Sequence, residues 1–186
     1  MTTVKMPANA VNPPPLEAFS AFNTFELKPV NMQDGCSKQS GADSAFQGVQ
    51  GRLGKILTPV LTEWNQRKKP ETATRRLIIE PFCTDAKMIG TAKRIFTGPL
   101  SGSSAVVMRV RYTDAASGRV VAEPEFYQRA FAMGGAYSFG GTDRNMLTRM
   151  TTLITEYTQN NYRIAVGGPT GVEDEAPAGT ATTAQK

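Results

Sequence analysis

The sequence lacks most of the residues on which catalytic and metal sites are usually built. Its 186 residues include no histidine and two cysteines. Serine and cysteine triads of the common form need an imidazole base, and two thiolates without histidine fall short of the usual zinc ligand sets. We therefore expect no catalytic triad, no metal site and no cofactor.

Long apolar segments are also missing. No run approaches the roughly 20 apolar residues of a membrane-spanning helix, and residues 1–15, MTTVKMPANAVNPPP, have no apolar centre like that of a signal peptide. We expect residues 1–18 to form an extended, proline-rich tether. From Gly167 onward one valine is the only large apolar residue, so residues 165–186 are expected to be a disordered tail. A single domain at 19–164 lies between them.

Positive charge is in moderate excess, with 21 Lys and Arg against 16 Asp and Glu and a net charge of +5. The local cluster RKKPETATRR, at 67–76, falls between a predicted helix and a predicted strand. Nucleic-acid-binding proteins usually gather such charge on one face and interleave it with aromatic residues. A solvated loop is the preferred interpretation, and a cytosolic nucleic-acid-binding protein that uses this segment is the alternative.

The first half of the domain reads as a strand, a helix and a second strand. In FNTFELKPV, Phe25 and Leu27 alternate with charged residues, as in a half-buried strand. A helix starting at Asp43 or Ser44 and running to about residue 67 carries apolar residues on one side at helical spacing. The mostly apolar RRLIIEPFC is the second strand. A right-handed crossover through the helix would make the two strands parallel.

Residues 103–126, SSAVVMRVRYTDAASGRVVAEPEF, predict a hairpin with two different faces. A turn centred in DAASG sets Tyr112 opposite Val120 on an apolar face. The same register sets Arg109 opposite Glu123 on the other face, where a cross-strand ion pair marks the side toward solvent.

An amphipathic helix that begins at Thr142 or Asp143 closes the domain, because apolar residues recur at helical spacing from Met146 to Tyr157. The predicted fold is therefore α+β. It consists of a small mixed, mainly antiparallel sheet of about four strands, with both helices packed on its apolar face.

Cys36 and Cys83 are a candidate disulfide. Cys36 follows the first strand and Cys83 ends the second. Parallel strands joined by a crossover end at the same edge of a sheet, so the two thiols can meet. A bridge requires an oxidising compartment. The alternative is two unrelated thiols, one buried and one in a loop.

Carboxylates are the remaining candidates for acid–base chemistry: Glu80, Asp85, Glu123 and Glu125. Nothing in their spacing indicates a catalytic pair. We do not expect an enzyme, and a small hydrolase or ligand carrier with an unrecognised site is a further alternative.

A longer run, GTAKRIFTGPLSGSSAVVMRVRYTDAASGRVVAEPEF, resembles a bacterial domain-of-unknown-function family of predicted envelope lipoproteins. The matching parts are a Lys-Arg pair at 93–94, glycines at 98 and 102, the valine-rich strand, the turn from Asp114 to Gly118 and the final helix. Together with FNTFELKPV and the first helix, the resemblance covers roughly residues 20–162.

The resemblance implies an exported precursor whose lipid-bearing cysteine stood at or near position 1, although this sequence has no such cysteine. It implies a location on the periplasmic side of a membrane, with a lipid anchor as the only membrane contact, and another envelope protein as partner. The expected contact surfaces are an edge strand, the sheet face and the loops with two glycines. Their candidate residues are Arg109, Arg111, Glu123, Glu125, Gly98 and Gly102.

Overall fold

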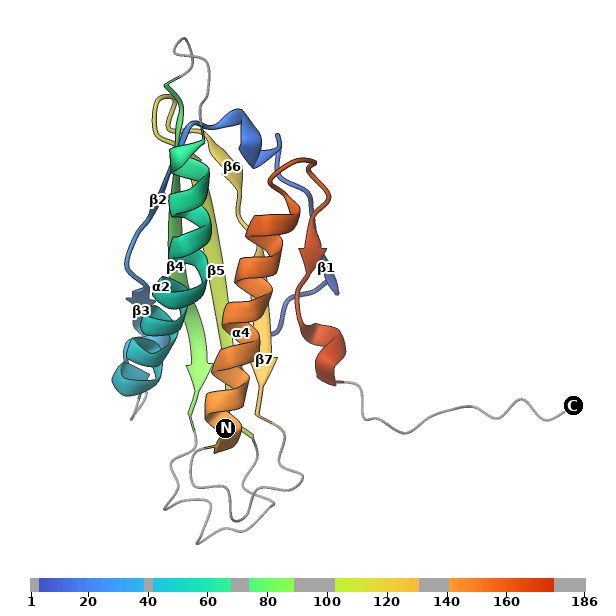
Figure 1. The fold of residues 1–186 in the computed structure, drawn as a ribbon. Coiled ribbons are helices and arrows are strands. Elements are labelled where there is room, and N and C mark those ends of the chain that lie inside the picture. The colour runs from blue at the N-terminus through green and yellow to red at the C-terminus, as the bar shows by residue number, and fades with distance from the viewer. Residues whose placement is uncertain (1–3, 39–41, 68–73, 89–102, 131–140, 176–186) are drawn as a thin grey trace, which may run out of the picture.

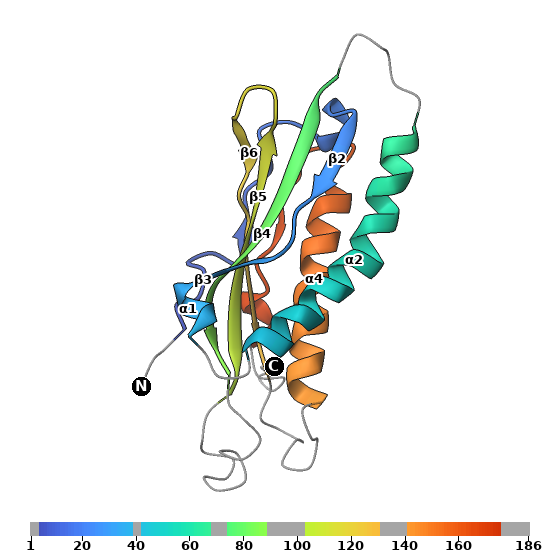
Figure 2. The same cartoon turned by 90° about the vertical axis from the view of Figure 1, so that its left-hand side faces the viewer.

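A computed structural model of the chain describes residues 4–38, 42–67, 74–88, 103–130 and 141–175. Two long helices, α2 (Ala42–Gln66) and α4 (Gly141–Asn160), lie side by side on one face of a mixed sheet. Figures 1 and 2 show this two-layer arrangement. The predicted α+β class, with both helices on one face, is confirmed.

The main sheet has six strands but is only four strands wide, because two short strands follow one another along each outer edge. Two long strands, β4 (Arg76–Lys87) and β5 (Ala105–Asp114), pair antiparallel at its centre. On one side β2 (Thr24–Leu27) and β3 (Asn31–Gln33) pair parallel with successive parts of β4. On the other side β6 (Val120–Ala122) and β7 (Glu125–Arg129) pair antiparallel with successive parts of β5. The four predicted strands correspond to these four positions across the sheet.

The core lies between the helices and the sheet. The apolar side of β5, with Met108, Val110 and Tyr112, is buried under the helices, as the alternation predicts. The ring of Tyr112 stacks on Phe19 at 4.7 Å, and its hydroxyl shares a 2.6 Å hydrogen bond with Thr158 on α4. This polar contact ties α4 to the centre of the sheet.

The hairpin register differs from the predicted one. Tyr112 pairs with Ala122 rather than with Val120, and Arg109 pairs with Glu125. Next to the turn, Thr113 pairs with Val120, which is one residue away from the predicted register, and a bulge between Tyr112 and Thr113 adds the second residue of the shift.

A shift of two keeps Arg109 and Glu123 on their predicted face. Next to the turn, however, the bulge exchanges the two valines: Val120, predicted to lie on the apolar face, is 40% exposed, and Val121 is buried in the core instead.

Both terminal segments pack on the domain, which therefore extends beyond 19–164. In the predicted tether, β1 (Val11–Asn12) pairs antiparallel with β8 (Gly168–Pro169) from the predicted tail. A short 3₁₀ helix, η3 (Val172–Glu175), follows β8 and packs beside β7. The predicted tail residues 176–186 lie outside the described residues. Composition misled here because these segments are ordered by hydrogen bonds and by contacts with the finished sheet rather than by apolar periodicity.

Candidate interaction surface

Cys36 and Cys83 are joined by a disulfide, with their Cα atoms 6.0 Å apart. Cys36 lies in the short helix α1 (Asp34–Ser37), which follows β3, and Cys83 lies within β4 rather than at its end. The pair meets at a bulge of β4, to which α1 comes very close. A Cβ atom on Gly35 would lie 2.4 Å from a carbonyl oxygen of β4, so this approach requires glycine.

The sheet face opposite the helices carries the predicted charged residues. Glu123 accepts from Arg111 at 3.0 Å and from Arg109 at 3.3 Å, and Arg109 also lies 3.6 Å from Glu125. The two arginine side chains expose 42% of their surface. These four residues therefore form one ion-pair group, which we call the arginine–glutamate ladder.

Apolar side chains border the ladder. Phe82 and Ile78 on β4 are half-buried beside it, and the guanidinium of Arg111 lies 5.2 Å from the centroid of the Phe82 ring. Further along the same face, Val4 covers Val107 in a separate apolar cluster. The N-terminal segment thus covers one end of this face, and the ladder remains accessible at the other.

The β2 edge of the sheet is capped by a side chain from α2. The Asn65 amide accepts from the Phe25 N–H at 2.7 Å and donates to the Phe25 carbonyl at 3.1 Å. A strand added at this edge would use the same two groups. An arriving strand would therefore have to displace Asn65.

The opposite edge is capped in the same way. The Asn12 amide donates to the Glu125 carbonyl and accepts from the Glu125 N–H, both at 2.9 Å. The Tyr127 N–H, further along β7, donates to the Thr170 carbonyl at 2.8 Å. The two terminal segments thus occupy the edge of β7, and the predicted edge-strand contact is blocked at these positions on both sides of the sheet.

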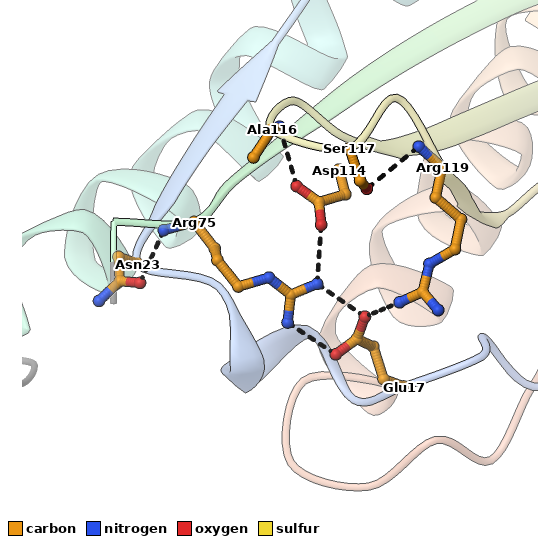
Figure 3. A network of polar contacts seen from close by, with 7 residues as sticks. All are labelled: Glu17, Asn23, Arg75, Asp114, Ala116, Ser117 and Arg119. Carbon is orange, nitrogen blue, oxygen red and sulfur yellow. Dashed lines mark hydrogen bonds and ion pairs between the residues drawn. The ribbon is translucent and has the colours of Figure 1, made fainter. Parts of the chain in front are cut away.

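A group of ion pairs fastens the N-terminal segment to the turn of the hairpin (Figure 3). Arg75 donates two 2.8 Å hydrogen bonds to Glu17 and one of 2.9 Å to Asp114. Glu17 also accepts from Arg119. The hydrogen bonds from Arg75 hold the pKa values of Glu17 and Asp114 below their ordinary values. The Arg75 side chain further lies over the Phe22 ring at 4.2 Å.

These contacts involve the basic segment predicted as an alternative nucleic-acid site. Arg75 is paired with two carboxylates, Arg76 pairs with Glu26, and Arg67 pairs with Glu63. The described arginines of the segment are thus neutralised by the protein itself. Residues 68–73 lie outside the described residues.

Other predicted site residues are dispersed or lie outside the described part of the chain. Gly98 and Gly102 belong to a range that the structure does not describe. Glu80 faces Arg111 across the strand pair, and Asp85 accepts from the Lys5 N–H. Among the described residues, no group of three or more potential metal ligands occurs. Within the same ranges, no helix is both long and apolar enough to cross a membrane.

Sequence reasoning missed the residues that order the termini and cap the edges, namely Asn12, Glu17 and Asn65. Each acts on a residue at least 40 positions away. A lone asparagine or glutamate carries no local signal of such a contact.

No protein-family model and no curated protein matches the sequence. Among solved structures, a PelC dodecamer from Paraburkholderia phytofirmans is 13% identical with a TM-score of 0.47, over 82% of this chain and 97% of that one. A DUF330 protein from Xanthomonas campestris is 12% identical with a TM-score of 0.40, over 86% and 96%. A candidate lipoprotein from Caulobacter crescentus is 12% identical with a TM-score of 0.33, over 74% and 86%.

These neighbours include a domain-of-unknown-function family and a lipoprotein, the two kinds of protein that the sequence resemblance names.

Proposed function

We propose that the chain is a non-catalytic protein-interaction module of the bacterial cell envelope. It works on the periplasmic side of a membrane, after export as a precursor with a lipid anchor, and it binds another envelope protein. Its contact surface is the arginine–glutamate ladder with the neighbouring Phe82 and Ile78.

The disulfide is the observation that supports the compartment. Both Cys36 and Cys83 are fully buried, and the bridge joins α1 to the central strand β4. Structural disulfides of this kind form in secreted and periplasmic proteins and are rare in the cytosol of mesophilic cells. An exported protein satisfies this requirement.

The choice of surface follows from which parts of the sheet are accessible. The helices cover one face, and asparagine side chains cap both edges at Phe25 and Glu125. The ladder face keeps exposed arginines next to a half-buried aromatic ring, and arginine and aromatic residues are enriched in the energetically important parts of protein interfaces. The alternating charges would set the register of a partner more than its affinity.

Photo-crosslinking in the native bacterium tests this proposal. A photoreactive amino acid is placed at Arg109 on the ladder and, in a matched control, at Glu63 on α2, whose side chain is exposed and also ion-paired. We expect the variant at 109 to yield one dominant adduct with an envelope protein, and the variant at 63 to yield none.

A charge reversal checks that the adduct forms because the partner binds the arginines of the ladder. Arg109→Glu combined with Arg111→Glu should abolish the adduct formed from a photoreactive residue at Phe82, whereas Arg67→Glu, directly after α2, should leave it intact. Equal crosslinking of the reversed and original proteins would rule out the ladder as the contact surface, and adducts only from position 63 would move the contact to the helices.

A further inference from the structure

The charges on the open part of the ladder face balance each other. Within the described residues, the face from the turn of the hairpin to Phe82 carries four positive and four negative side chains. They are Lys28, Arg76, Arg109 and Arg111 against Glu26, Glu80, Glu123 and Glu125. This part of the face is therefore neutral, although the whole chain carries +5.

The N-terminal segment covers the other end of the face. There Val4 packs on Val107, and the Lys5 N–H donates to Asp85. The remaining charges of this side, on Lys87, Arg129 and the acidic η3, lie at this covered end. At the opposite end, the ion-pair group around the turn adds two charges of each sign: Arg75 and Arg119 against Glu17 and Asp114. The neutral part between the two ends is what a partner can reach.

One row of side chains across this open part alternates in sign. The register of β2 and β4 sets Lys28 beside Glu80. Glu80 pairs with Arg111, and Arg111 donates to Glu123 at 3.0 Å. From β2 to the residue after β6, the row thus reads positive, negative, positive, negative.

A row of this kind is complementary to itself after a half-turn. A two-fold axis parallel to the strands, between β4 and β5, lays the row of one copy over the reversed row of another. Glu80 then faces Arg111 of the second copy, and Lys28 faces its Glu123, so every contact in the row joins opposite charges. An axis across the strands would instead lay each charge over itself. Only the first orientation is attractive.

The neighbouring row supports the same orientation. Within one copy, Phe82 pairs with Arg109 across β4 and β5. The half-turn exchanges these two positions, so Arg109 of one copy lies over the Phe82 ring of the other, as in a cation–π contact. Figure 2 shows that both helices lie on the opposite side of the sheet, out of the way of such a contact.

We propose that the partner at the ladder face is a second copy of this chain, packed face to face about this axis. The inference rests on the proposed function for the choice of surface, and it names the partner. A partner with one sign of charge gains no net attraction from a neutral face, because half of the side chains repel it. An unrelated partner would need the same alternating pattern, whereas a second copy presents it by symmetry.

Sedimentation equilibrium with the full chain tests the proposal. We expect a monomer–dimer equilibrium that weakens as salt is raised. Two double variants make the row uniform in sign: Glu80→Lys with Glu123→Lys makes it positive, and Lys28→Glu with Arg111→Glu makes it negative. Each variant alone should dimerise at least about tenfold more weakly than the original chain, and an equimolar mixture of the two should form a heterodimer. Glu63→Lys, a matched reversal on α2, should leave the dimer unchanged.

The mixture guards against a misleading loss of dimer, because a variant that failed to fold would not regain binding from its counterpart. An original chain that stays monomeric at low salt, dimers that survive both reversals, or a mixture that stays monomeric would each overturn the proposal.

The crosslinking experiment separates this inference from the proposed function. A dominant adduct between position 109 and a different envelope protein would support the proposed function and overturn the contact between copies. Dimers in solution that respond to the reversals as expected, without any adduct from position 109 in cells, would support the contact between copies and overturn the proposed function.

Discussion

Reducing the disulfide should remove a large part of the stability of the fold. Cys36 and Cys83 are separated by 47 residues, and the chain-entropy treatment of a loop of this length gives about 4 kcal/mol at 25 °C. Domains of this size are typically stable by about 5–15 kcal/mol, so the bridge accounts for a substantial share.

The assay is urea unfolding of the same protein with and without a phosphine reductant, followed by far-ultraviolet circular dichroism. For a slope of about 2 kcal/mol per molar urea, we expect the midpoint to fall by about 2 M on reduction. Comparing oxidised with reduced protein changes only the crosslink and leaves both sulfur atoms in the core. A decrease of less than about 1 kcal/mol would refute the reasoning, because the bridge would then constrain little of the unfolded chain.

Cysteine-to-alanine variants separate packing from crosslinking. Cys36→Ala, Cys83→Ala and the double variant are compared with the reduced protein, which has the same open chain. The single variants should each lose stability relative to reduced protein, because both sulfur sites are fully buried. The free energy of unfolding of the double variant should be lower than that of the reduced original protein, and it should be lower still in comparison with the oxidised original protein.

Further predictions concern the edges, the ion-pair group and two glycines. Asn65→Ala removes two hydrogen bonds to the edge of β2 and should lower the free energy of unfolding by about 1–3 kcal/mol in urea titrations. Arg75 lowers the pKa of Glu17 in the folded protein below its ordinary value of 4.5. The stability that this ion pair contributes is therefore complete above the pKa of Glu17 in the unfolded chain, and it is lost as the pH falls through the lower pKa of the folded protein. The variant Glu17→Gln should therefore lose less stability than the original protein when the pH is lowered from about 5 to about 3, as measured by thermal melting at each pH. Gly51→Ala should stabilise α2 by about 0.5–1 kcal/mol, because nothing lies within 4 Å of the added Cβ. Gly35→Ala should instead destabilise, because its Cβ would meet a carbonyl oxygen at 2.4 Å.

Much of the sheet could be predicted from the sequence because its signals are local. The alternation along β5 assigns Tyr112 and Val110 to the core and Arg109 and Arg111 to the outer face, and a period of two survives the bulge. The register itself could not be predicted, since the extra residue at the bulge depends on how the turn is anchored. There Asp114 accepts from the Ala116 N–H and from Arg75, which lies 39 residues away.

The termini could not be predicted because their order depends on the completed sheet. Asn12 and Thr170 contact β7 at Glu125 and Tyr127, and neither lies in a segment with apolar periodicity. The proline-rich start was predicted to be a tether on composition alone. Its hydrogen bonds, and those of the Asn161 side chain, are formed with partners that composition does not reveal.

The ladder lies between these two cases. The sequence places Arg109, Arg111, Glu123 and Glu125 on the solvent side of the hairpin, and the structure joins them in one ion-pair group and adds the neighbouring Phe82. What the sequence could not supply is the capping of both edges by asparagine, which leaves this face as the accessible part of the sheet.

The envelope location on which the proposed function rests is tested most directly by trapping thiols in the living bacterium. Cells that express the native gene are quenched with acid, alkylated with a mass-shifting maleimide under denaturing conditions, and examined with and without prior reduction. We predict that Cys36 and Cys83 are unlabelled until reduction and take up two labels afterwards. Two labels without reduction would contradict the account, because they would place the folded chain in a reducing compartment.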